Sequence, residues 1–228
     1  MPVFKLTDEL IFPSPELAEG DGLLCVGGDL SEQRLLLAYS MGIFPWYSDG
    51  DPILWWSPDP RLVLFPRELK VSRSLRQTLK NDIYEITADT AFAEVIRNCA
   101  GVRRKWDKGT WITAEMTDAY IQLHRSGFAH SIECWHDGDL AGGLYGVALG
   151  GVFFGESMFA KKNNASKVAF VALVKQLIKW DFALIDCQVT TRHLISFGAR
   201  EIPRSEFIRR VEKALKMPAK KGIWHLGP

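Results

Sequence analysis

A chain of 228 residues with 47% hydrophobic and 24% charged residues has the composition of a globular protein and is long enough to bury a sizeable core. Its 28 Lys and Arg against 27 Asp and Glu leave a formal net charge of +1, which excludes a general attraction to polyanions. No stretch has the apolar length of a signal peptide or a membrane span. The four cysteines are far apart and make no Cys-x-x-Cys pair, so we expect reduced thiols in a cytoplasmic protein without membrane contact.

The first sixty residues are rich in Pro, Gly and Trp and predict one helix within otherwise ordered loop. Asp29 or Ser31 can cap this helix. The tryptophans of the region stand beside prolines, which fix φ and hold the rings in place. We place a domain boundary at Pro58-Asp59-Pro60, which divides the chain into an N-terminal domain (1–61) and a second domain (62–228).

Beyond this boundary, the apolar periodicity predicts strands that alternate with helices. The expected strands are 62–65, 83–87, 129–136, 140–149, 152–156 and 183–187, and the expected helices lie at about 71–79, 92–99, 113–127 and 166–179, before Gly198, and after a cap at Ser205. The strands between 129 and 156 are predicted to form an antiparallel meander. The fold class is therefore α+β, with a central sheet flanked by helices.

Several common kinds of site find no support in the sequence. The glycines between 142 and 151 match neither a dinucleotide fingerprint nor a P-loop, and they mark bulges or a close approach of a ligand to the backbone. Ser157 lacks the second glycine of a nucleophile elbow, because Phe159 stands there. The five histidines have no metal-binding spacing. We expect neither a metal nor a cofactor.

Polar residues interrupt two apolar runs that are predicted as strands. Glu156 follows Val152-Phe153-Phe154-Gly155, and Asp186 and Gln188 follow Ala183-Leu184-Ile185. A carboxylate buried beside such a run is costly without a partner. Strand alternation places Asp186 and Gln188 on one side, so the carboxylate can accept a hydrogen bond from the Gln188 side-chain amide. Taken alone, a satisfied structural pair is the simpler interpretation.

Together with other segments, these residues resemble a known family. The segments are Gly-Ile-Phe-Pro-Trp (42–46), Trp-Trp-Ser-Pro-Asp-Pro-Arg (55–61), Gly-Thr-Trp-Ile-Thr (109–113), Gly-Glu-Ser-Met-Phe (155–159) and Asp-Cys-Gln (186–188). In this fixed order they resemble leucyl/phenylalanyl-tRNA protein transferases. The resemblance implies a bacterial cytoplasmic enzyme that moves leucine or phenylalanine from tRNA to the N-terminal Arg or Lys of a protein, which marks that protein for degradation. It also implies a GNAT-like acyltransferase domain with a mostly antiparallel sheet. We expect a monomer.

The resemblance also implies roles for single residues. Asp186 orients Gln188, and Gln188 positions the attacking amine. Glu156 meets the cationic end of the acceptor, where a desolvated carboxylate discriminates Arg or Lys from neutral residues. Trp46 and Trp111 stack on the terminal adenosine of the tRNA. The donor side chain is expected among apolar residues, for which core packing is an equally good interpretation: Leu144, Phe153, Met158, Phe170, Leu173 and Ile185.

A basic helix face is the expected contact for the tRNA acceptor stem. Its residues, which taken alone would indicate only a solvated face, are Lys70, Arg73, Arg76 and Lys80.

An α-amino group with a pKa of about 7.7–8.0 is partly neutral at pH 7, so we favour orientation of the amine over proton abstraction by Gln188.

Two other functions compete with this interpretation. An acyl-CoA acyltransferase needs a glycine-rich pyrophosphate loop, whereas residues 160–166 contain no glycine. A non-catalytic tRNA-binding module would explain the basic helix and the tryptophans. It would not explain why Glu156, Asp186 and Gln188 occur together.

Overall fold

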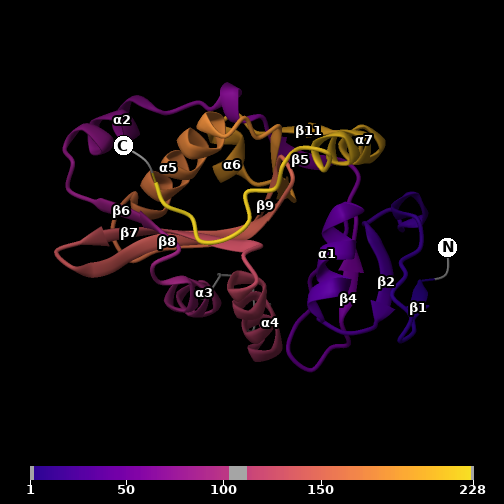
Figure 1. Ribbon diagram of the computed structural model, residues 1–228. Coiled ribbons are helices and arrows are strands. Elements are labelled where there is room, and N and C mark those ends of the chain that lie inside the picture. Colours follow the sequence, from indigo (N-terminus) through magenta and orange to yellow (C-terminus); the bar gives the residue numbers. More distant parts are fainter. Residues whose placement is uncertain (1–2, 103–111, 227–228) are drawn as a thin grey trace.

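The computed structural model describes residues 3–102 and 112–226, and their strands form two sheets (Figure 1). Within these ranges the smaller sheet has four strands, in the order β1 (Phe4–Leu6), β2 (Leu23–Gly27), β4 (Leu54–Trp56) and β3 (Phe44–Pro45). The larger sheet has seven strands in the described chain, in the order β11 (Arg200–Ile202), β5 (Arg61–Leu64), β10 (Leu184–Gln188), β9 (Val152–Ala160), β8 (Asp139–Leu149), β7 (Ala129–His136) and β6 (Glu85–Ala88).

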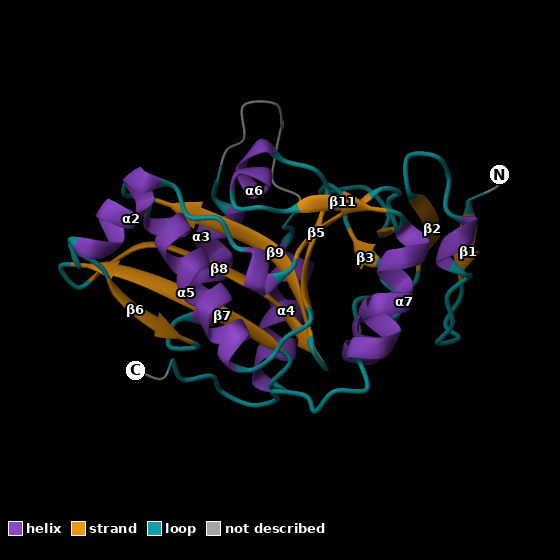
Figure 2. Ribbon diagram, turned by 90° about the horizontal axis from the view of Figure 1, so that it is seen from above, coloured by secondary structure: helices purple, strands orange, loops and turns teal. Residues whose placement is uncertain are grey.

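Helices cover both faces of the larger sheet (Figure 1). The helices are α1 (Glu32–Ser40) beside the smaller sheet, α3 (Phe92–Ala100) and α4 (Ala114–Arg125) on one face of the larger sheet, α5 (Ala165–Lys179) with α2 (Arg73–Lys80) on the other, and α6 (Arg192–Ser196) and α7 (Arg204–Ala214) near the junction of the sheets. Seen from above, α6 lies between α2 and α7 along the length of the molecule (Figure 2). The α+β class and the predicted meander β7-β8-β9 are confirmed.

One pair of strands in the larger sheet runs in parallel. β9 and β10 are parallel, whereas the other neighbouring strands of this sheet are antiparallel. Parallel strands cannot be joined by a hairpin and need a crossover, which α5 provides. This crossover places Asp186 opposite Phe154, two residues before Glu156. Polar positions 30 residues apart in the sequence are therefore neighbours in the sheet.

Three details of the sequence-based prediction were wrong. The N-terminal region is not loop around one helix, because its short strands pair into a sheet. These strands have two to five residues, too few for alternation to reveal them. The strand expected to end at Glu156 continues to Ala160. The last helix starts at Arg204, with Pro203 in the N-cap position, because the Arg204 backbone N–H already donates to the side chain of Asp59.

A hydrophobic core runs without interruption from the smaller sheet to the larger one. Trp55 and Tyr39 belong to the same buried cluster as Phe154 and Phe207, and all four side chains are essentially inaccessible to solvent. A second cluster fills the space between the larger sheet and α5. The junction of the two sheets is thus rigidly packed, which is a condition for a precise site. Within the described ranges, no helix is long and apolar enough to cross a lipid bilayer.

The segment after α7 returns across the larger sheet (yellow in Figure 1) and contains Trp224. The Trp224 backbone N–H donates to Asp89 over 2.7 Å, and its ring stacks on His130 at 3.8 Å between centroids. The rings of Trp224 and Phe153 are also neighbours, with 6.0 Å between their centroids. The C-terminal segment therefore supports a strand of the central sheet, close to the cavity described next.

Candidate active site

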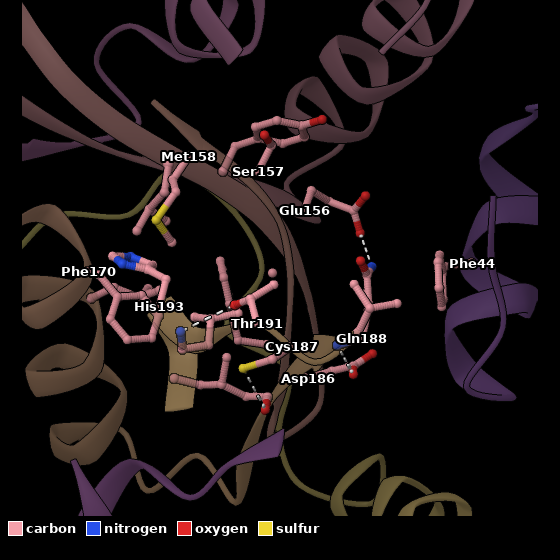
Figure 3. Close-up of a pocket in the computed structure, with 18 of the residues that line it drawn as sticks. Phe44, Glu156, Ser157, Met158, Phe170, Asp186, Cys187, Gln188, Thr191 and His193 are labelled. Atoms are coloured by element: carbon pink, nitrogen blue, oxygen red, sulfur yellow. Dashed lines mark hydrogen bonds between the residues drawn. The ribbon is translucent and has the colours of Figure 1, made fainter. Parts of the chain in front are cut away.

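A cavity of about 400 Å³ opens between the smaller sheet and the α5 side of the larger one (Figure 3). Its apolar wall consists of the side chains expected for the donor pocket, namely Leu144, Phe153, Met158, Phe170, Leu173 and Ile185. Phe44, Pro45 and Trp46 line it from the smaller sheet. The polar residues Glu156, Asp186 and Gln188 also line it, and Figure 3 shows Glu156 and Gln188 on the side facing Phe44. The cavity is thus apolar along most of its wall and polar at one end.

Two β-bulges create this polar end. In β9, Tyr145 pairs with Ser157 and Gly146 with Gly155, so Glu156 is the extra residue. In β10, Asp186 pairs with Val63 and Gln188 with Leu62, so Cys187 is the extra residue. A bulge interrupts the alternation of a strand and redirects the side chains around it. Both polar segments found in the sequence therefore lie at irregular points of neighbouring strands.

Gln188 has a backbone conformation that is unusual for a residue with a side chain. Its φ is 59°, in the left-handed region that costs non-glycine residues roughly 1–2 kcal/mol. The Gln188 backbone N–H donates to the Asp186 carboxylate over 2.9 Å, which holds the turn in place. The side-chain amide of Gln188 donates to Glu156 over 3.0 Å (Figure 3).

The expected hydrogen bond between the Asp186 carboxylate and the Gln188 side-chain amide was wrong. That expectation depended on regular alternation, which the bulge at Cys187 interrupts. Asp186 holds the Gln188 backbone, and Glu156 holds the Gln188 side chain. Because the amide nitrogen donates to Glu156, the amide oxygen of Gln188 can accept a hydrogen bond from a ligand in the cavity.

Asp186 is itself held by a buried arginine. Arg61 donates from Nε and Nη2 to the two carboxylate oxygens over 2.8 and 2.6 Å, and neither residue is exposed to solvent. The Arg61 guanidinium also lies 4.8 Å from the ring of Phe44 and 4.6 Å from that of Phe207. This two-pronged ion pair connects β5, β10, α7 and the smaller sheet at the base of the cavity.

Glu156 lies in a ring of hydrogen-bond donors. Its Oε1 accepts from the Tyr39 hydroxyl over 2.7 Å and its Oε2 from the Tyr120 hydroxyl over 3.2 Å, in addition to the Gln188 amide. Tyr39 comes from α1 and Tyr120 from α4, and their hydroxyls also contact each other. Burial raises the pKa of the Glu156 carboxyl to about 7, although the hydrogen bonds from Tyr39 and Tyr120 act in the opposite direction.

Sequence reasoning missed several residues that form or support this site. Neither Tyr39 nor Tyr120 was assigned a role in the site. Arg61 was part of a recognised motif, which was a usable signal, but nothing in the sequence identified Asp186 as its partner. His193 also lines the cavity, opposite Glu156 in Figure 3, and burial lowers its pKa.

Of the residues expected to bind RNA, the structure describes Trp46 and the four basic residues. Trp46 lines the cavity and is 40% exposed, and its backbone oxygen accepts a hydrogen bond from Trp56. Trp111 lies outside the described residues. The four basic residues are exposed on α2 and just before it, they do not line the cavity, and no ion pair within the described chain engages them: Lys70, Arg73, Arg76 and Lys80.

Comparison with known proteins shows which family the sequence matches. The sequence model described as "Leucyl/phenylalanyl-tRNA protein transferase" matches residues 63–212, and that of the N-terminal domain of the same proteins matches residues 28–59. The chain belongs to the leucyl/phenylalanyl-tRNA protein transferase family. The relative of that name from Anaeromyxobacter sp. (strain Fw109-5) is 61% identical over 99% of this chain and 96% of its own length. The one from Syntrophobacter fumaroxidans is 65% identical over 91% of this chain and 89% of its own length.

Both family matches contribute to the cavity. The match to the transferase N-terminal domain includes Phe44 and Trp46, whereas Glu156, Asp186 and Gln188 lie within the other match. Among solved structures, "The structure of L-PGS from Bacillus licheniformis" covers 74% of this chain and 54% of its own length, with 12% identity and a TM-score of 0.40. That likeness is too weak to support an argument about fold or function.

Proposed function

We propose that this protein transfers leucine or phenylalanine from aminoacyl-tRNA to the N-terminal Arg or Lys of an acceptor protein. The observation that carries the proposal is the cavity, whose apolar wall leads to the oriented amide of Gln188. Membership of the transferase family supports the same reaction. Marking the acceptor for degradation would be the consequence in the cell.

The apolar wall accommodates the donor side chain, because a cavity of about 400 Å³ with a mostly apolar lining favours leucine and phenylalanine over polar residues. At the polar end, the Gln188 amide oxygen accepts an N–H of the acceptor amine and directs its lone pair at the ester carbonyl. Asp186, held by Arg61, is a positioning residue that fixes the Gln188 backbone. Glu156 is assigned to the acceptor side of the site.

The remaining sites are proposed from the family resemblance and from exposure. Trp46 and Trp111 stack on the terminal adenosine, and the four basic residues of the α2 region contact the acceptor stem. We also propose a GNAT-like domain from residues 62 to 228 and a smaller one from 1 to 61, in a cytoplasmic monomer. The parallel β9-β10 pair within an otherwise antiparallel sheet supports this fold assignment.

The proposed function is tested by incubating the protein with leucyl-tRNA and a peptide that begins with Arg, and by measuring leucine on the peptide by mass spectrometry. A peptide with a blocked amino terminus is the matched control, since it has no amine to attack. Leucyl peptide is expected only with the free amine. If acetyl-CoA replaces leucyl-tRNA as donor, or if no peptide product forms, the proposed function is refuted.

The basic residues of the α2 region predict how tRNA binding depends on the salt concentration. Each phosphate contact releases counterions, so Arg76→Gln is expected to reduce the slope of log K against log salt for tRNA binding by about 1. Arg97→Gln is the control, because Arg97 is an exposed arginine on α3, on the other face of the sheet. Filter binding between low and moderate salt measures both slopes. Equal slopes for the two variants would remove Arg76 from the RNA interface.

A further inference from the structure

Peptide-bond formation releases a proton, and few groups around the cavity can take it. The Asp186 carboxylate already accepts two hydrogen bonds from Arg61 and one from the Gln188 backbone. The Gln188 amide is not a base. Burial raises the pKa of the Cys187 thiol, so that thiol stays protonated at neutral pH. His193 lines the cavity opposite Glu156 (Figure 3), so the carboxylate that lies beside Gln188 and is not held by an arginine is Glu156.

The surroundings of Glu156 have room for one more proton. Three oxygen-to-oxygen contacts join Tyr39, Tyr120 and Glu156 in a closed triangle. Two phenol groups supply two protons, whereas three hydrogen bonds need three. Burial and the nearby Glu156 carboxylate raise the pKa of both phenols well above the usual value, so neither phenol loses its proton near neutral pH. A protonated Glu156 completes the triangle, and an ionised one leaves it one proton short.

We propose that Glu156 accepts the proton that the α-ammonium group of the acceptor loses, and that Tyr39 and Tyr120 are positioning residues that hold Glu156 ready for it. This inference rests on the proposed transfer reaction and specifies what Glu156 does in it. The cation that Glu156 meets is then the α-ammonium group, and not the basic side chain of the first acceptor residue.

The ammonium nitrogen carries three protons, and Glu156 takes one of them. The neutral amine that remains donates a hydrogen bond to the amide oxygen of Gln188. The amine attacks the ester carbonyl, the N–C bond forms, and the bond from the carbonyl carbon to the ribose oxygen breaks. A second nitrogen proton goes to that ribose oxygen, and the third stays on the new amide. Glu156 later returns its proton to water.

The charge around Glu156 determines how the rate depends on pH. The titratable groups that face it are Tyr39 from α1, Tyr120 from α4 and Asp186 from β10, and Arg61 from β5 offsets the charge of Asp186. Burial places the Glu156 pKa at about 7, so below this pH the carboxyl group is already protonated and cannot accept a proton. The transfer rate is expected to fall as the pH falls through 7.

The test compares pH profiles of kcat/KM for the wild type, Tyr39→Phe and Glu156→Gln, with one acceptor peptide whose own ionisation is common to all three. Tyr39→Phe removes a donor to the carboxylate, so its acidic limb is expected to move up by about one pH unit. At high pH, kcat/KM of Tyr39→Phe is expected to approach that of the wild type. Glu156→Gln is expected to lose about 100-fold at neutral pH. Tyr84→Phe is the control, because the Tyr84 hydroxyl donates to the Asn163 backbone, away from the cavity.

Carbon-13 NMR of the Glu156 carboxyl in the ligand-free enzyme gives a second readout that needs no activity. A titration near pH 7 that moves upward in Tyr39→Phe supports the proposal. An unmoved acidic limb in Tyr39→Phe overturns it, as does a wild-type rate in Glu156→Gln. The proposal is also overturned if Glu156→Gln lowers kcat/KM only for peptides that begin with Arg or Lys and leaves it unchanged for peptides with a neutral first residue. A wild-type enzyme that forms no leucyl peptide at any pH refutes the proposed function itself.

Discussion

Arg61→Leu is expected to destabilise the protein by about 3–5 kcal/mol, because it leaves the Asp186 carboxylate buried without its cation. Both side chains of the ion pair are fully buried, so water cannot take the place of the guanidinium. The guanidinium also packs between Phe44 and Phe207, and this contact is lost as well. Denaturant unfolding followed by circular dichroism measures the change in the free energy of unfolding.

Two further variants make this result specific. Arg61→Leu combined with Asp186→Leu removes both charges, so it is expected to recover most of the lost stability while the enzyme stays inactive. Arg67→Leu breaks the ion pair between Arg67 and Asp181, and both of these side chains are about three-quarters exposed. This variant is expected to change the free energy of unfolding by less than about 1 kcal/mol. If Arg61→Leu and Arg67→Leu cost the same, the Arg61–Asp186 pair does not hold the base of the cavity.

Gln188→Ala is expected to lower the single-turnover transfer rate by about 100-fold, since loss of the oriented amide leaves the acceptor amine without a fixed direction of attack. Binding of aminoacyl-tRNA is expected to stay within about twofold of the wild type, because the apolar wall and the basic helix are unchanged. Quench-flow kinetics and filter binding measure the two quantities. Gln122→Ala, at an exposed position on α4, is the control. An unchanged rate in Gln188→Ala would exclude Gln188 from the reaction.

The backbone at Gln188 allows a sharper comparison. Gln188→Gly and Gln188→Ala both lack the amide, but only glycine adopts a φ of 59° without cost. The glycine variant is therefore expected to be more stable than the alanine variant by about 1 kcal/mol, with an equally low rate. Such a result would show that the protein maintains an unfavourable backbone conformation in order to aim this side chain.

Strong local signals explain which helices the sequence revealed. The Ser31, Ser72 and Thr113 side chains each accept a hydrogen bond from the backbone three residues later, which is the N-cap geometry that begins α1, α2 and α4. The stripe Phe92, Val95, Ile96 and Cys99 is buried along α3, as its spacing predicts. Helix formation depends mainly on neighbours within one or two turns, so the sequence carries it directly.

The sequence did not reveal the strands of the smaller sheet. β1 and β2 pair in parallel although some twenty residues separate them, and β3 has only two residues. Pairing partners so distant leave no periodic pattern in either strand. Trp55 illustrates the result, since its position beside prolines was visible in the sequence but its hydrogen bond to the Gly27 backbone was not.

For the candidate active site, the sequence alone determined the family and pointed to residues that line the cavity, among them Glu156, Asp186 and Gln188, because these are matters of residue type and order. Only the tertiary structure decided their connections: Arg61 with Asp186, Tyr39 and Tyr120 with Glu156, and Glu156 with the Gln188 side chain. The physical reason is the pair of bulges in β9 and β10, which changes the direction of side chains that regular alternation would have placed elsewhere. Burial by two helices and two sheets then gives these connections their electrostatic effect.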